Sequence, residues 1–149
     1  MEATTTFNKL RPTDVPMERP RWAYLILIAV TIVVGLASRK YDSLLPPILQ
    51  KNAGDILWAT TAFWIAGVVF RGKATLHNAT LCVLFSVGIE FLKFVHTPWL
   101  DAVRRIPGAY FVFGHTFSWE NIVCYAVGIV LGVGIEAAWM LGSQIVQEE

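Results

Sequence analysis

The sequence predicts an all-α polytopic membrane protein, a bundle of four transmembrane helices with an interfacial loop between the third and the fourth. Hydrophobic residues make up 55% of the 149 residues, and charged residues make up 15%, whereas soluble domains contain about 25% charged residues. Four long apolar runs follow one another along the chain, separated by polar segments. Six Trp, four Tyr and nine Phe are enough to form aromatic belts at both membrane interfaces.

The chain begins with a polar segment, residues 1–21, which we expect to be an irregular tail because it lacks apolar periodicity. Three prolines and four basic residues lie in it: Pro12, Pro16, Pro20, Lys9, Arg11, Arg19 and Arg21. The transmembrane domain is predicted over residues 22–141. A short acidic tail, residues 142–149, completes the chain.

The first span is predicted over residues 22–38, a run slightly shorter than the roughly 20 residues that a hydrocarbon core requires. Trp22 can anchor one end, and Arg39 and Lys40 can snorkel at the other. A polar tail precedes the run and no small-x-small pattern follows it, so we interpret it as a retained span and not a cleaved signal. Pro46 and Pro47 are expected to stop any helix in the following loop.

The second and third spans are predicted over residues 55–70 and 76–96, joined by a very short loop into an antiparallel hairpin. Asp55 is expected to cap the second span, where a carboxylate meets free N–H groups and the helix dipole. Its aromatic stripe is expected to face lipid or an interfacial belt: Trp58, Phe63, Trp64 and Phe70. Pro98 follows the third span and ends it.

The loop over residues 97–118 combines apolar and charged residues at helical spacing, which predicts a short amphipathic turn in the interface. Its aromatic piece, 109–113, is either re-entrant or an interfacial strand-like segment. The fourth span is predicted over 118–141, with Ser118 as N-cap and Glu136 near the headgroups of the far side. Gly128 and Gly132 form a G-x-x-x-G pattern, which favours close helix packing within the molecule.

The distribution of Lys and Arg predicts the orientation. Six of these cations fall in the N-terminal tail and the loop after the second span, and five fall in the other two connections. Because cations favour the cytoplasmic side and the first helix usually dominates, both termini are predicted to be cytoplasmic.

Several chemistries lack support in the sequence. A net charge of +1 argues against a nucleic-acid surface. Cys82 and Cys124 lie in apolar runs, where cysteine acts as a small hydrophobe. His96 and His115 lack the spacing of a metal site, even with Glu90 or Glu120 nearby. We therefore predict no metal, no cofactor and no catalytic residue.

Polar side chains from all four spans and the last loop are expected at one membrane level. They are Arg39, Asp55, Glu90, Lys93, Asp101, Arg104, Arg105 and Asn121. Ionisable residues at such depth are costly and by default mark a functional site.

Two roles remain open for this cluster. As a headgroup site, its Lys and Arg residues would bind phosphate or another anion, while Glu90 and Asp101 would orient them or accept a proton. As a structural network, pairs such as Arg39–Asp55 or Glu90–Arg104 would fix the helix register. In either case Glu90 is expected to be buried beside a cation, with Arg39 or Arg104 as the first choice and Lys93 as the second.

The chain resembles the small bacterial membrane proteins grouped as domain of unknown function 2809, which are similar in layout to the VanZ-like proteins linked to low-level teicoplanin resistance. The resemblance covers about residues 22–141. It rests on five segments: G-L-A-S-R at 35–39, G-D-I-L-W-A at 54–59, E-F-L-K at 90–93, P-W-L-D-A-V-R at 98–104 and F-S-W-E-N-I-V-C-Y-A-V-G at 117–128.

The residues that match the family's positions are Arg39, Asp55, Glu90, Asp101 and Arg104. Two positions depart from the VanZ-like pattern. Lys93 stands where Gln is usual, and Asn121, preceded by Glu120, stands where Asp is usual. The resemblance implies a multi-pass protein of the bacterial cytoplasmic (inner) membrane.

Two functions are expected from these observations. The first is a VanZ-like envelope protein that binds an anionic lipid or a lipid-linked headgroup through the outward-facing polar cluster, with membrane lipids as its partners. The second is a non-catalytic accessory subunit of a larger membrane complex, with other membrane protein subunits as partners. A bundle without a soluble domain suits the second function well.

Overall fold

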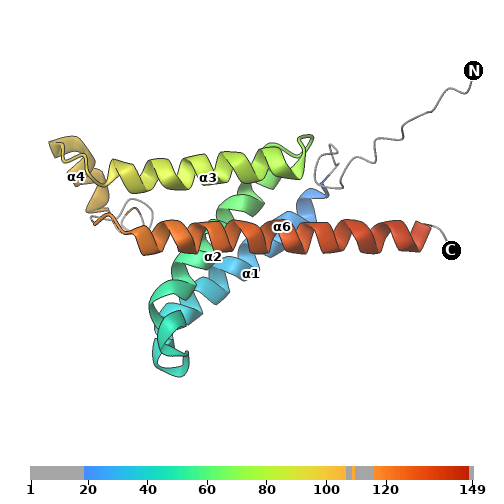
Figure 1. The fold of residues 1–149 in the computed structure, drawn as a ribbon, viewed down its shortest axis with the longest axis horizontal. Helices are drawn as coiled ribbons and strands as arrows, with labels where there is room; N and C mark the ends of the chain where they lie inside the picture. The colour runs from blue at the N-terminus through green and yellow to red at the C-terminus, as the bar shows by residue number, and fades with distance from the viewer. Residues whose placement is uncertain (1–18, 107–108, 110–115, 148–149) are drawn as a thin grey trace, which may run out of the picture.

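A computed structural model describes residues 19–106, 109 and 116–147, with side chains described up to residue 142. This part of the chain is all-α, with five α-helices, one short 3-10 helix and no strand (Figure 1). The elements are α1 (Arg21–Lys40), η2 (Asp42–Leu44), α2 (Pro47–Val69), α3 (Thr75–Leu92), α4 (Pro98–Arg104) and α6 (Trp119–Gln147). The aromatic piece after Ala109 and His115 lie outside the described residues.

Three helices are long and apolar enough to cross a membrane, which makes this a membrane protein. They are α1, α3 and the Trp119–Gly142 part of α6. The remaining long helix, α2, carries the polar residues Gln50, Lys51, Asn52 and Asp55 near its start.

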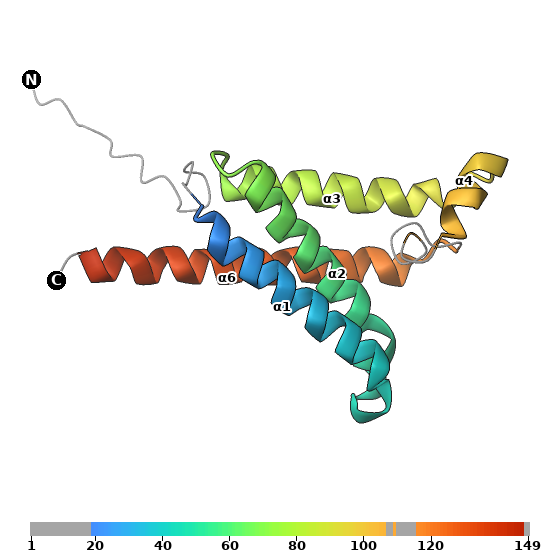
Figure 2. The same cartoon turned by 180° about the vertical axis from the view of Figure 1, so that it is seen from behind.

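α3 and α6 lie side by side, and the antiparallel pair α1 and α2 crosses them obliquely (Figures 1 and 2). α2 is central, because it packs against α1, α3 and α6. The buried core lies around it and consists of Tyr24, Ala59, Phe63, Trp64, Ala79, Cys82, Tyr125 and Ile129.

The central place of α2 corrects the prediction for its aromatic stripe. Phe63 is 0% exposed and Trp64 is 1% exposed, so both belong to the core and not to a lipid-facing belt. Trp58 is half-buried and only Phe70 is exposed. Periodicity alone could not locate these rings, because α2 contacts three other helices, α1, α3 and α6.

The start of α2 also differs from the prediction. Pro47 begins the helix instead of stopping it, because a proline at the first helical position loses no backbone hydrogen bond and has a suitable φ. Asp55 therefore lies two turns inside α2 and is not its N-cap. α3 ends at Leu92, short of the predicted residue 96, whereas the short amphipathic helix after Pro98 is confirmed as α4.

Glycines let α6 lie close against α2. A Cβ at Gly128 would lie 2.1 Å from the backbone oxygen of Ile56, and one at Gly132 would lie 2.6 Å from the ring of Phe63. Only a residue without a Cβ allows this approach. The prediction that this G-x-x-x-G pattern packs within the molecule is confirmed.

Candidate functional site

Glu90 is the centre of a buried polar cluster at the end of α3. Its carboxylate is 0% exposed. It accepts hydrogen bonds from the Ser118 backbone N–H at 2.8 Å, from Asn121 Nδ2 at 3.2 Å and from the Tyr125 hydroxyl at 3.4 Å. All three donors lie on α6 or immediately before it, so Glu90 ties the end of α3 to the start of α6.

The cation beside Glu90 is Lys93, whose Nζ lies 2.6 Å from Glu90 Oε2. The predicted burial of Glu90 is confirmed, but the order of its expected partners is wrong, since Arg39 and Arg104 were expected first. A spacing of three residues places both groups on one helix face. Lys93 itself is only 5% exposed, so the pair is buried as a unit.

Arg104 does not pair with Glu90 but binds the end of α3. Its guanidinium donates to the backbone oxygens of Leu92 and Val95, at 2.8 Å and 3.0 Å, and to Asp101 Oδ1 at 2.9 Å. The last carbonyl groups of a helix have no partner within the helix, and Arg104 satisfies such groups at the end of α3. These hydrogen bonds join α4, which carries Arg104, to the end of α3. The Arg104 side chain is buried.

Arg39 reaches the surface at the end of α1. Its Nη2 lies 3.4 Å from Asp55 Oδ1, and the two side chains are 40% and 25% exposed. The predicted Arg39–Asp55 pair is thus confirmed as a long, partly solvated contact. The guanidinium lies over Gly54, where a Cβ would be 2.6 Å from Arg39 Nε.

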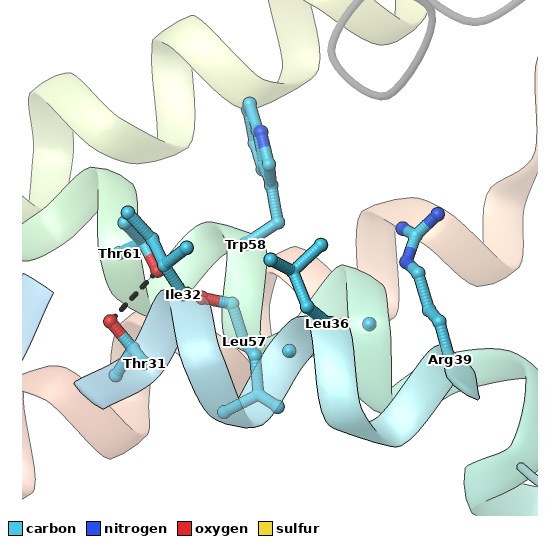
Figure 3. A pocket seen from close by; sticks show the side chains of 9 residues that line it. Thr31, Ile32, Leu36, Arg39, Leu57, Trp58 and Thr61 are labelled. Carbon is cyan, nitrogen blue, oxygen red and sulfur yellow. Dashed lines mark hydrogen bonds between the residues drawn. The ribbon is translucent and has the colours of Figure 1, made fainter. Parts of the chain in front are cut away.

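An apolar groove of about 160 Å³ runs between α1 and α2 and ends at Arg39 (Figure 3). Its lining residues come from both helices: Thr31, Ile32, Gly35, Leu36, Arg39, Gly54, Leu57, Trp58 and Thr61. The two threonine hydroxyls bond to each other at 2.9 Å and to carbonyl groups of their own helices. The groove therefore offers one charged group, at one end.

A second apolar groove, of about 570 Å³, lies between α2 and α3. Its α2 wall extends from Trp58 to Phe70, and its α3 wall consists of Leu81, Cys82 and Phe85. Trp58 and Thr61 line both grooves. A third groove, of about 440 Å³, lies between α3 and α6 and is lined by small and aliphatic residues such as Ala79 and Ala126.

A family model described as "Protein of unknown function (DUF2809)" matches the chain. It matches residues 44–129, which is more than half of the chain. The chain belongs to the DUF2809 family. The matched region includes Asp55 and the whole Glu90 cluster, whereas Arg39 precedes it. No solved structure matches the chain.

The remaining predicted site residues of this DUF2809 protein lie at the surface or beside it. Arg105 is exposed after the end of α4, and Asn121 is half-buried in the first turn of α6. Within the described residues, no three His, Cys, Asp or Glu side chains gather as a metal site requires.

Lys51 and Glu120 form an exposed ion pair that joins the start of α2 to the start of α6. Sequence reasoning missed this pair, because 69 residues separate its members and both types are common on surfaces.

A second buried polar cluster lies at the opposite end of α1 and was not predicted. Arg19 Nε and the Tyr24 hydroxyl both donate to Glu136 Oε1, each at 2.6 Å. Arg19 also donates to the backbone oxygens of Arg71 and Lys73, at 3.0 Å and 2.6 Å. The 1% exposure of Arg19 shows that it belongs to the bundle and not to an irregular tail.

The signal for this second cluster was present in the sequence. Glu136 is an acidic residue within a long apolar run, and such a residue requires a partner. We had expected it to reach the headgroups, but it is 1% exposed. Its partner, Arg19, could not be chosen from the four cations of the tail without the fold.

Proposed function

We propose that this protein is a small, four-span integral membrane protein of the VanZ-like type that binds an anionic lipid or lipid-linked headgroup at Arg39. The observation that carries the proposal is the position of the Arg39 guanidinium at the end of an apolar groove between α1 and α2. An amphiphile with an anionic head and an apolar chain complements this arrangement.

Arg39 suits this role better than the other predicted cations. Lys93 and Arg104 are buried, whereas the Arg39 side chain is 40% exposed and lies 3.4 Å from Asp55. Partly exposed pairs of this kind contribute about 0–1 kcal/mol, so a phosphate can compete with Asp55 at little cost. The planar guanidinium also offers two parallel donors to a phosphate.

In this proposal α2 is the fourth span. Its 23 residues give a total length of about 34 Å, of which the apolar part after Asp55 is about 21 Å, so its polar start must reach into the edge of a hydrocarbon core of about 30 Å. It packs against all three helices that are long and apolar enough to span, α1, α3 and α6. Its polar residues lie near its start, at the level of Arg39, where they can meet the headgroups.

We place both termini in the cytoplasm of a bacterium, with the protein in the inner membrane and Arg39 at the outward face. Arg19 contacts the backbone of Arg71 and Lys73, so these three cationic residues gather at one end of the bundle. The positive-inside rule favours that end as the cytoplasmic one.

Native mass spectrometry of the protein released from mixed nanodiscs tests the headgroup site. The nanodiscs contain equal amounts of phosphatidylglycerol and phosphatidylcholine. The wild type should retain phosphatidylglycerol in preference, and Arg39→Gln should reduce that preference by about fivefold, since a Lys or Arg at an anionic surface contributes about 1 kcal/mol. Lys40→Gln is the matched control, because Lys40 is exposed at the same helix end but does not line the groove.

Two results would contradict the proposal. One is a wild type that retains both lipids equally. The other is an equal loss of phosphatidylglycerol in the Arg39 and Lys40 variants, which would assign the effect to general interfacial charge. Circular dichroism on both variants establishes that they remain folded.

An accessory subunit remains the second candidate function, and one observation favours it. α1 exposes a row of large apolar side chains, among them Leu25, Val33 and Leu36, at 56%, 65% and 59%. A helix of another subunit can cover them as well as lipid can. Co-purification in mild detergent, followed by protein mass spectrometry, should then return one stoichiometric membrane partner, which Val33→Trp should release.

A further inference from the structure

We infer that the lipid bound at Arg39 is a glycerophospholipid with two acyl chains, one in the α1–α2 groove and one in the α2–α3 groove. The inference rests on the proposed function and specifies its ligand. A polyprenyl phosphate also presents a phosphate, as a monoester with more negative charge, but it has a single chain, so the two ligand classes differ in how many grooves they need.

The two grooves lie on either side of one residue. Trp58 lines both of them, and its ring extends from α2 towards α3, on the same side of α1 as the Arg39 side chain (Figure 3). A chain in one groove is therefore separated from the other groove by the indole ring. Two chains that leave one headgroup would pass Trp58 on its two sides.

The polar side chains that line the two grooves favour the Arg39 end as the position of the headgroup. The hydroxyls of Thr31 and Thr61 deeper in the α1–α2 groove already bond to each other and to helix carbonyls. The α2–α3 groove is lined by aliphatic and aromatic side chains beyond Thr61. Among the described residues that line the two grooves, Arg39 is the one charged side chain, so an anion gains most there.

The lengths of the grooves agree with acyl chains. Along α2, the first groove extends from Gly54 to Thr61 and the second from Trp58 to Phe70. At a rise of about 1.5 Å per residue these segments measure about 10 Å and 18 Å. Half of a hydrocarbon core is about 15 Å. The second groove is thus about as long as one leaflet is thick, and the first is shorter.

The test compares ligands that share the phosphate but differ in chains, added to the full-length protein in detergent and measured by native mass spectrometry. The probes are dioleoyl phosphatidylglycerol, its single-chain lyso form and a polyprenyl phosphate. We expect the two-chain lipid to bind about tenfold more tightly than either single-chain probe, because its second chain adds van der Waals contacts in the second groove.

A substitution that fills only the α2–α3 groove sharpens the test. Ala62→Trp should bring the affinity for the two-chain lipid close to that for the lyso form and leave lyso binding unchanged. Ala126→Trp is the matched control, since Ala126 lines the third groove and is exposed. Ile65→Trp is a second variant should Ala62→Trp fail to fold, because Ile65 lines the same groove and is 47% exposed.

Three results overturn the inference: equal binding of two-chain and lyso lipids, tighter binding of the polyprenyl phosphate, or unchanged binding in a folded Ala62→Trp or Ile65→Trp variant. Each of them leaves the headgroup site intact provided that Arg39→Gln still weakens binding. If Arg39→Gln has no effect on any probe, the proposed function itself fails.

Discussion

Replacing Glu90 by Gln tests whether the buried cluster holds the bundle together. The substitution keeps the shape of the side chain but removes the charge opposite Lys93, whose Nζ lies 2.6 Å away and whose side chain is 5% exposed. Breaking a buried ion pair from one side costs about 3–5 kcal/mol, because the remaining charge is left without a partner. The new amide N–H₂ would also face another donor, either Lys93 or the Tyr125 hydroxyl.

The geometry predicts that loss of Glu90 and loss of Lys93 lower the free energy of unfolding by different amounts. Lys93→Met leaves Glu90 with its donors from Ser118, Asn121 and Tyr125, so it should cost less than Glu90→Gln. The double variant should recover most of the loss, because no charge is then buried alone.

Equilibrium unfolding with SDS in mixed micelles, followed by circular dichroism, measures these differences in the free energy of unfolding. The reasoning is refuted if Glu90→Gln costs less than about 1 kcal/mol, the range of an exposed pair. It is equally refuted if Lys93→Met is the more damaging change.

Three further predictions concern the packing and the site. Gly128→Ala should lower the free energy of unfolding by about 1–3 kcal/mol, since its Cβ would meet a backbone oxygen of α2. Gly134 has open space around it, so Gly134→Ala should be neutral or stabilising by up to about 1 kcal/mol. Equal effects of the two substitutions on the free energy of unfolding would contradict the close packing at Gly128. Arg104→Ala should free α4 from α3 and speed hydrogen exchange there, whereas protection equal to that of the wild type would argue against its capping role. Gly54→Ala should displace the Arg39 guanidinium and weaken binding of phosphatidylglycerol in the nanodisc assay, with stability nearly unchanged; unaltered lipid retention would contradict the position assigned to Arg39.

The helices could be predicted because each long apolar run is a local property of the sequence. Their ends were less predictable, and Pro47 shows why. The same residue stops a helix when it follows one and starts a helix when it takes the first position, and the sequence alone does not separate these cases. The inner and outer faces of α2 were unpredictable for another reason, since its neighbours are set by the fold.

The site was predictable in its members but not in its pairings. Glu90 and Lys93 could be placed on one helix face from their spacing, and the need for a buried partner followed from the cost of a lone charge. The pairing of Arg104 with the end of α3 depends on the turn after Leu92, which no spacing rule provides. The contact between Arg19 and Glu136 joins residues 117 positions apart, so it follows only from the three-dimensional arrangement.

A crystal structure of the protein grown from a lipidic mesophase that contains phosphatidylglycerol tests the headgroup site most directly. The account predicts a phosphate within hydrogen-bond distance of the Arg39 guanidinium, with acyl density in the groove between α1 and α2. A structure that shows Arg39 bonded to Asp55 alone, with no phosphate at the end of that groove, would contradict it.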